Sequence, residues 1–150
     1  MLKGIDPVLN ADVLHALMSM GHGDDVVIVD ANFPADAVAQ ETVYGSLLRM
    51  DVDAPRAARA ILSVLPLDTF VETPVQRMDV VGRPGEIHPV MAEVQAEMDR
   101  AEGRPVAMGT VERFAFYELT RKAYAVILTG ERRFYGNFVF KKGVIPPDAS

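Results

Sequence analysis

The sequence predicts an α/β domain in which helices cover both faces of a mixed sheet of about six strands. Segments with the two-residue period of strands alternate with segments of helical period along the chain. The run 26–29 is β-branched and apolar on both faces, which is typical of a strand covered on both sides. Because no internal repeat, low-complexity tract or linker interrupts this pattern, we expect one domain.

Four helices are expected, each with a recognisable start or stop. Asn10 can cap the first, and Gly21 and Gly23 end it. Asp53 and Pro55 open the second, over 56–65. The third runs from Pro89 to Glu102 before Gly103, and the fourth over 114–122. The side chains expected to face the core are Val13, Leu14, Leu17, Met18, Met20, Ala57, Ala60, Ile61, Val64, Met91, Val94 and Met98.

Six segments read as strands. The first ends at the polar sequence that starts with Asp30, and the third ends at the turn 82–85. The last two flank a turn at 130–134. The expected strands are 26–29, 46–50, 75–81, 106–111, 124–129 and 137–141.

Composition narrows the class of protein. The chain has 150 residues, 49% hydrophobic and 24% charged, as in an ordinary folded domain. It has no cysteine and therefore no disulfide, which suits a reducing cytoplasm. The longest apolar run, 123–128, is far shorter than the about 18–20 residues that span a bilayer, and the first residues lack the apolar region of a signal peptide. We therefore expect a cytoplasmic protein with no membrane partner.

Charge argues against a nucleic-acid partner, because the net charge is −6 and phosphate binding needs a clustered basic surface. The charge is unevenly distributed. Residues 1–102 carry 7 basic and 17 acidic groups, and residues 103–150 carry 8 basic and 4 acidic groups. Such asymmetry marks complementary subunit surfaces or disappears when the two parts mix in the fold, and the second interpretation is favoured.

Several motifs are missing. The sequence contains no phosphate-binding Gly-x-x-x-x-Gly-Lys-Ser/Thr loop and no Gly-x-Gly-x-x-Gly after a strand. It also lacks a Gly-x-Ser-x-Gly nucleophile elbow and a paired-histidine zinc motif. The chemistry that remains is acid–base catalysis or binding, without a cofactor.

His22 and Asp30 form the first candidate site. Glycines on either side leave His22 uncrowded, and histidine both gives and takes protons near neutral pH. Asp30 follows a buried strand, where α/β sheets commonly place ligand-facing groups. On the local pattern alone, a helix end with a solvated histidine is the favoured interpretation. A metal site is disfavoured, because His15 and His88 have no ligand spacing to His22; we expect His88 to be exposed and His15 to be satisfied locally.

Residues 113–140 form the second candidate, with eight of the eleven aromatic residues. Most of these should pack in the core or in an interface. Arg113 stands beside aromatic residues, and Tyr135 and Asn137 flank a glycine. Such groups suit a polyhydroxylated ring, whose hydroxyls need donors and acceptors and whose C–H face stacks on an aromatic plane. A turn with Tyr135 in a dimer contact explains the same pattern.

Taken together, several motifs resemble the RbsD/FucU sugar mutarotase family, and its L-fucose mutarotase branch in particular. The resemblance runs in order from Met1 to about Pro146, so we expect one domain over 1–146 and a short tail over 147–150. The motifs are Met20-Gly21-His22-Gly23-Asp24, Asp30-Ala31-Asn32-Phe33-Pro34, Pro66-Leu67-Asp68-Thr69, Arg113-Phe114-Ala115-Phe116-Tyr117-Glu118, Thr129-Gly130-Glu131 and Tyr135-Gly136-Asn137.

The resemblance implies a three-layer α/β/α domain that assembles into pentamer-based rings or decamers with sites between subunits. It implies a cofactor-independent isomerase that interconverts the α and β anomers of a free aldose, with L-fucose or a related 6-deoxyhexose as the expected substrate. In the family's pattern His22 is the catalytic proton donor and Tyr117 has a binding or catalytic role. The residues that match substrate contacts are Asp30, Asp68, Arg113, Tyr117, Tyr135 and Asn137.

The sugar and the activity keep alternatives at this stage. Asn32 stands where many fucose-branch members have histidine, which leaves the sugar open. A ribose-type mutarotase, a non-catalytic sugar-binding accessory of the same fold and, less favoured, a metal-dependent sugar isomerase are the competing hypotheses. Either Tyr117 or Tyr135 can serve as the second proton carrier beside His22.

Overall fold

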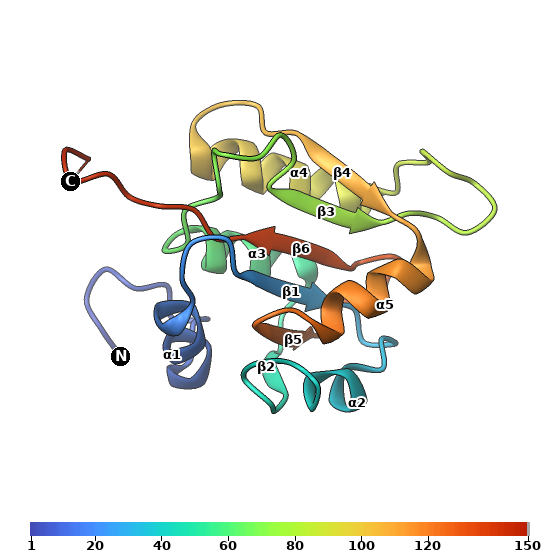
Figure 1. The fold of residues 1–150 in the computed structure, drawn as a ribbon, viewed down its shortest axis with the longest axis horizontal. Coiled ribbons are helices and arrows are strands. Elements are labelled where there is room, and N and C mark those ends of the chain that lie inside the picture. Colours follow the sequence, from blue (N-terminus) through green and yellow to red (C-terminus); the bar gives the residue numbers. More distant parts are fainter. Residues whose placement is uncertain (150) are drawn as a thin grey trace.

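A single six-stranded sheet organises the computed structural model, which describes residues 1–149 (Figure 1). Its strand order is β2-β5-β1-β6-β3-β4. β6 pairs antiparallel with β1 and β3, and the other neighbours are parallel. The strands are β1 Asp25–Val29, β2 Leu48–Met50, β3 Val75–Met78, β4 Met108–Val111, β5 Ala125–Thr129 and β6 Phe138–Lys141. The mixed six-stranded sheet predicted from the sequence is confirmed.

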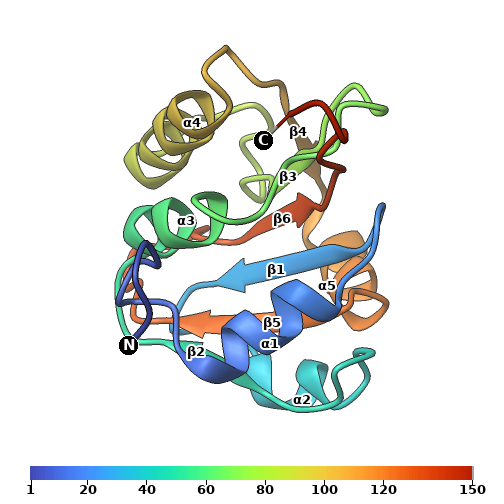
Figure 2. The same cartoon turned by 90° about the vertical axis from the view of Figure 1, so that its left-hand side faces the viewer.

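Within residues 1–149, five helices cover the two faces of the sheet, as Figure 2 shows for α3 and α4 on one side and α5 on the other. Alternate residues of β1 point to the two faces: Val26 and Ile28 pack with α1, α3 and α4, and Val27 and Val29 pack with α2 and α5. The predicted three layers are therefore present. The helices are α1 Ala11–Ser19, α2 Ala35–Ala39, α3 Ala54–Leu62, α4 Pro89–Glu102 and α5 Arg113–Arg121.

Local sequence explains where the longer helices begin and end. The Asn10 side chain accepts a hydrogen bond from Val13 N (2.9 Å) at the start of α1. Asp53 accepts one from Arg56 N (2.9 Å) at the start of α3. Gly103 ends α4 with a left-handed φ of 70°, a conformation that costs glycine little.

Three expectations were wrong in detail. α2 was not predicted, because it has only five residues and its N-cap, Pro34, makes no side-chain cap hydrogen bond. Met18 was assigned to the core but is exposed, and Leu14 and Val64 are only partly buried. β3 ends at Met78 rather than residue 81, because the chain turns away before Val81, whose side chain is exposed.

Folding pairs charged side chains from the acidic and the basic parts of the sequence. Arg121 pairs with Glu41 (Nε–Oε2, 3.0 Å), and Lys141 pairs with Asp25 (Nζ–Oδ1, 3.0 Å). These pairs join the basic C-terminal third to the acidic remainder of the chain. The favoured interpretation, that the two parts mix in the fold, is supported by these contacts.

Strand direction gives the sheet two chemically different edges. The five parallel strands end at one edge, where β6 begins; we call this the carboxyl edge. The opposite amino edge holds the turn between α1 and β1, the segment before β3 and the end of β6 (Figure 1). Polar side chains gather at both edges.

Candidate functional site

A pocket of about 240 Å³ opens at the carboxyl edge of the sheet. Its walls come from the segment after β1, the end of β3, the start of α5 and the loop between β5 and β6. Polar and aromatic side chains converge on it, as a sugar site requires. The lining residues are Asp30, Asn32, Phe33, Met78, Arg113, Tyr117, Phe134, Tyr135 and Asn137.

Asp30 and Asn137 form the buried floor of the pocket. β1 delivers Asp30 and the adjacent antiparallel strand β6 follows Asn137, so pairing of the two strands brings these residues together. Asp30 N donates to Asn137 Oδ1 (2.9 Å), and Asp30 Oδ1 accepts from Asn32 N (3.0 Å). Burial raises the pKa of Asp30, although these backbone and amide hydrogen bonds act in the opposite direction. The floor therefore holds a carboxylate that is costly to ionise until a ligand hydrogen-bonds to it.

Arg113 and Tyr117 form one wall of the pocket. They lie four residues apart on α5 and so share one helix face. Arg113 Nε donates to Tyr117 Oη (3.1 Å), and the guanidinium carbon lies 5.7 Å from the Tyr117 ring centre. The phenol oxygen thus accepts from a cation and keeps its own hydrogen free to donate.

Tyr135 forms the rim of the pocket in a strained conformation. Its φ is 64°, in the left-handed region that non-glycine residues rarely occupy. Tyr135 Oη accepts from Val81 N (3.0 Å), and the His88 ring meets its ring edge-on at 5.5 Å. These contacts hold the phenol over the pocket and offset the backbone strain.

Glu131 supports the loop that carries Tyr135 and Asn137. Its buried carboxylate accepts from Ala54 N at the start of α3 (3.3 Å) and from the Arg133 guanidinium (Nη2–Oε1, 2.9 Å). Burial alone would raise the pKa of Glu131, but the hydrogen bonds from Arg133 and from Ala54 N lower it overall. Glu131 therefore stays ionised and ties the loop to α3.

His22 and Asp68 lie at the amino edge. His22 Nε2 is 3.0 Å from Asp68 Oδ1, and the Phe70 ring packs edge-on against the imidazole at 5.0 Å. β1 separates this pair from the pocket: residues 25 and 30 are about 16 Å apart along a strand that rises about 3.3 Å per residue. One chain therefore presents two groups of functional side chains at opposite ends of the same strand.

Comparison with known proteins decides the family. The model of the RbsD / FucU transport protein family matches residues 3–145. This chain belongs to the RbsD/FucU family. The chain is 42% identical over 149 residues to the human fucose mutarotase, a match that covers 96% of this chain and 94% of that protein.

Solved structures of the RbsD/FucU fold agree with this assignment. Protein Atu2016 superimposes with a TM-score of 0.95 at 60% identity, covering 97% of each chain. The fucose mutarotase of Streptococcus pneumoniae in complex with L-fucose has a TM-score of 0.82 at 37% identity, covering 97% of this chain and all of that one. Bacillus subtilis RbsD, complexed with D-ribose, is 22% identical with a TM-score of 0.70 over 97% of this chain, which supports the fold alone.

The RbsD/FucU motif residues divide between the two edges. The pocket brings together five of those singled out from the sequence: Asp30, Arg113, Tyr117, Tyr135 and Asn137. His22 and Asp68 are paired with each other and do not line it. The hydrogen bond between His22 and Asp68 is not predictable from the sequence, because 46 residues separate the two side chains.

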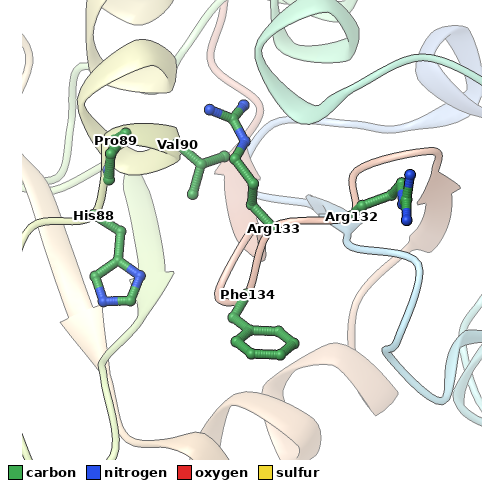
Figure 3. A pocket seen from close by; sticks show the side chains of 6 residues that line it. All are labelled: His88, Pro89, Val90, Arg132, Arg133 and Phe134. Carbon is green, nitrogen blue, oxygen red and sulfur yellow. The ribbon is translucent and has the colours of Figure 1, made fainter.

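Several residues of the site were missed as functional candidates. Phe33, Met78 and Phe134 also line the pocket, and the only available signal was the position of Met78 at the end of a strand. A second cavity of about 310 Å³ adjoins it, and Phe134 lines both. Figure 3 shows that His88 and the start of α4 form one side of this cavity and the loop 132–134 the other. His88 was expected to be exposed; its side chain is half-buried, because Tyr135 packs against it.

Two further findings concern cations and membranes. Within residues 1–149, no group of three or more His, Cys, Asp or Glu side chains could hold a metal ion. In the same part of the chain, no helix combines the length and the apolar character needed to cross a membrane.

Proposed function

We propose that this protein is a mutarotase that interconverts the α and β anomers of a free aldose, with L-fucose as the first candidate. Support comes from full-length identity of about 40% to fucose mutarotases and from the L-fucose complex of the S. pneumoniae relative. The single structural observation that carries the proposal is the pocket of about 240 Å³ in which a carboxylate, a guanidinium, two phenols and two carboxamides meet.

The reaction requires only proton transfers and rotation about one bond. The anomeric hydroxyl loses its proton while the ring oxygen gains one, and the bond between the anomeric carbon and the ring oxygen breaks to give the open-chain aldehyde. Rotation about the bond from the anomeric carbon to its neighbour then presents the other face, and the reverse transfers close the ring. No electrons or phosphoryl groups move, so one proton donor and one acceptor beside a fixed sugar suffice.

The carboxyl-edge pocket supplies binding and one proton carrier. Asp30 and Asn137 accept from and donate to sugar hydroxyls, and Arg113 polarises an oxygen of the sugar. Tyr117 is the second proton carrier, because Arg113 Nε donates to its phenol oxygen and fixes it in the pocket wall while the phenol hydrogen stays free to be transferred. Tyr135, whose oxygen is bound to Val81 N, holds the sugar from the rim.

His22 of a neighbouring copy completes the site. The imidazole lies at the opposite edge from the pocket of its own chain, so a second copy must bring the two together. Each group also has a large exposed ring beside it, Phe70 at the amino edge and Phe114 and Phe134 at the carboxyl edge. Exposed apolar side chains of this size are typical of interfaces. We therefore propose a homo-oligomer, a pentamer-based ring or decamer, with sites between subunits.

Anomer exchange measured by saturation-transfer NMR tests the function directly. We expect the wild-type protein to accelerate exchange of L-fucose above the uncatalysed rate, and His22→Ala to lose about 10²–10⁴-fold of that acceleration. His15→Ala is the matched control, since it removes an exposed imidazole from α1, and should keep the wild-type rate.

The outcomes separate the competing functions. Wild-type exchange after His22→Ala would remove the proposed role of the imidazole. Binding of L-fucose without acceleration by the wild-type protein would favour the non-catalytic accessory. A panel with L-fucose, D-ribose, L-rhamnose and D-galactose identifies the sugar, and faster exchange of D-ribose than of L-fucose would favour the ribose-type activity.

A further inference from the structure

His22 stands in a short turn that joins α1 to β1 at the amino edge. α1 ends at Ser19, and its last turn contains no basic residue. The last carbonyl oxygens of a helix have no partner within the helix and carry a partial negative charge, so a nearby cation stabilises them. The start of the His22 turn therefore offers carbonyl oxygens to a cationic donor from another part of the chain.

Lys142, directly after β6, supplies this donor. Its ammonium donates to Leu17 O (2.8 Å) in the last turn of α1 and to Met20 O (2.5 Å) just beyond the helix. The Lys142 side chain also lines an apolar cavity of about 340 Å³ together with Leu17 and Ile145. The stem of the lysine thus packs as an apolar side chain, while its charge lies at the end of α1.

The backbone of the same residue holds the other side of the turn, where the end of β6 runs beside it (Figure 1). Lys142 N donates to Asp24 O (2.9 Å), and Gly23 N donates to Lys142 O (2.9 Å). The turn is also closed within itself, since Gly21 N donates to Asp24 Oδ2 (2.8 Å). Lys142 therefore binds the chain on both sides of His22, and its ammonium makes the contact on the side of α1.

The Lys142 ammonium does not hold the turn that carries Asp68. That turn is bound to the end of β6 through the backbone, because Asp68 N donates to Lys141 O (3.0 Å). Asp68 Oδ1 accepts from His22 Nε2, and within residues 1–149 Asp68 Oδ2 accepts no hydrogen bond, so that oxygen is open to a sugar hydroxyl. A change confined to the ammonium should therefore displace the imidazole more than the carboxylate.

We propose that Lys142 is a positioning residue for proton transfer: its ammonium fixes the end of α1 and thereby the place of the His22 imidazole in a site shared with a neighbouring copy. This inference rests on the proposed mutarotase function. Lys142 does not line the carboxyl-edge pocket. Its effect should therefore appear in kcat rather than in sugar binding.

Kinetics of Lys142→Met provide the first test. Methionine keeps an apolar stem and removes both hydrogen bonds of the ammonium. We expect kcat for L-fucose to fall by about 10- to 10²-fold, because a displacement of about 1 Å at a catalytic group can cost that much. KM should change less than about twofold. Lys142→Arg, whose guanidinium can still donate to both carbonyl oxygens, should bring kcat back to within about threefold of the wild-type value.

Lys122→Met is the matched control. Lys122 is the C-cap of α5 and is exposed, so this substitution removes a lysine from a helix end away from the His22 turn. It should leave both constants unchanged. Wild-type kcat for Lys142→Met, or a rise in KM as large as the fall in kcat, would overturn the proposal. A kcat for Lys142→Arg as low as that for Lys142→Met would also overturn it.

Mixed oligomers show which part of the shared site Lys142 serves. Assembled at random with Asp30→Asn, whose His22 turn is intact, Lys142→Met should regain about a quarter of the sites. Assembled with His22→Ala, which lacks the same part of the site, it should regain none. The reverse pattern would place Lys142 in the pocket and overturn the proposal. If His22→Ala and Asp30→Asn restore each other but neither restores Lys142→Met, the side chain serves the whole fold, and the proposal is likewise overturned.

A readout without sugar keeps the test independent of the function. The imidazole Cε1–H signal of His22 in ¹H–¹³C NMR of the ligand-free protein is identified by its loss in His22→Ala. We expect Lys142→Met to shift or broaden this signal, and Lys142→Arg and Lys122→Met to leave it unchanged. An unchanged signal in Lys142→Met contradicts the inference. The proposed function fails separately, if the wild-type protein does not accelerate anomer exchange while Lys142→Met still alters the His22 signal.

Discussion

Burial of Asp30 in the pocket lowers the stability of the folded protein. A carboxyl group is held at 4% exposure, with its pKa raised by burial, and Asn137 meets its backbone N–H through Oδ1. A group that is hard to ionise in the free protein can gain much from sugar hydroxyls that donate to it, because burial strengthens each hydrogen bond. In the proposed function, the binding that Asp30 contributes is therefore obtained at the expense of folding stability.

Asp30→Asn should stabilise the protein while it impairs function. The raised pKa means that the folded state holds this proton more tightly than the unfolded chain, so ionised Asp30 opposes folding at high pH and the cost disappears as pH falls. We expect a gain of about 0.5–2 kcal/mol in unfolding free energy, in the range of stabilising substitutions. Thermal unfolding measured at about pH 5 and about pH 8 should show the larger gain at the higher pH.

The same variant should bind L-fucose more weakly, since the amide is a poorer acceptor than the carboxylate. Asp53→Asn, at the N-cap of α3, is a control that replaces a carboxylate outside the pocket and keeps the capping acceptor. A lower melting temperature for Asp30→Asn than for the wild-type protein at the higher pH would mean that ionised Asp30 does not oppose folding.

At the level of single residues, much of the candidate site could be predicted from the sequence. Asp30 was predictable because a polar residue directly after an apolar strand lies at a sheet edge. The motif resemblance added Tyr117 and Asp68. What no local pattern could supply was the partnership of His22 with Asp68, because it depends on the end of β6 joining two distant turns.

Among the elements, the loop between β5 and β6 forms one wall of the pocket. It carries Phe134 and Tyr135 and is tied to α3 by Glu131. Gly136 lets the loop pack against that support: an added Cβ would lie 2.8 Å from Glu131 Cγ and 3.4 Å from Asp30 Cβ. Glu131 cannot move aside freely, because its carboxylate is held by Arg133 and Ala54 N.

Gly136→Ala should therefore distort the pocket. We expect a loss of about 1–3 kcal/mol of stability, typical of overpacking, together with weaker L-fucose binding as Tyr135 and Asn137 shift. Gly130→Ala in the same loop is the matched control, because its Cβ would meet only ordinary contacts at 3.5 Å or more. Denaturant unfolding and sugar titration of both variants check this, and equal effects of the two substitutions would argue against the Gly136 contact.

Element boundaries followed the sequence where capping residues were present. α1 and α3 begin after Asn10 and Asp53 as predicted. α2 had no such signal, and the exposure of Met18 could not be foreseen because an apolar residue next to a helical stripe is indistinguishable from a member of it. Tertiary packing, which the hydrophobic periodicity does not encode, determines both the formation of α2 and the exposure of Met18.

For the whole molecule, the central fact is that the two groups of candidate functional residues lie at opposite edges of one sheet. His22 and Asp30 are only eight residues apart in the sequence. In the fold they lie at opposite ends of β1, which separates them in space. No pattern in a single chain states how many copies meet. The mixing of charges within the fold also removes the simplest electrostatic argument for a subunit contact.

Mixed oligomers test whether a site is shared between copies. In a shared site, one copy supplies His22 and its neighbour supplies the pocket with Asp30, so His22→Ala and Asp30→Asn each disable a different part of the site. In oligomers assembled at random from equal amounts of the two variants, each part is intact in about half of the sites. Both parts are therefore intact in about a quarter of them. Anomer exchange of the co-refolded mixture measures this. Mixing Asp30→Asn with Asn137→Ala, two variants of the same half, should restore nothing. Mixed oligomers that are demonstrated by native mass spectrometry but remain inactive would contradict a shared site.

The strand β6 contributes to both edges of the sheet. Part of each group depends on this one short strand: Asn137 of the pocket directly precedes it, and the backbone oxygens of Lys141 and Lys142 at its end accept from Asp68 N and Gly23 N. It is also an interior strand, bonded to β1 on one side and β3 on the other. Its amides should be among the last to exchange with solvent, since such strands open only with the whole domain. Fraying of the outer strands β2 and β4 during heating would leave β6 in place. Unfolding of β6 would disrupt the side-chain groups at both edges of the sheet at the same time.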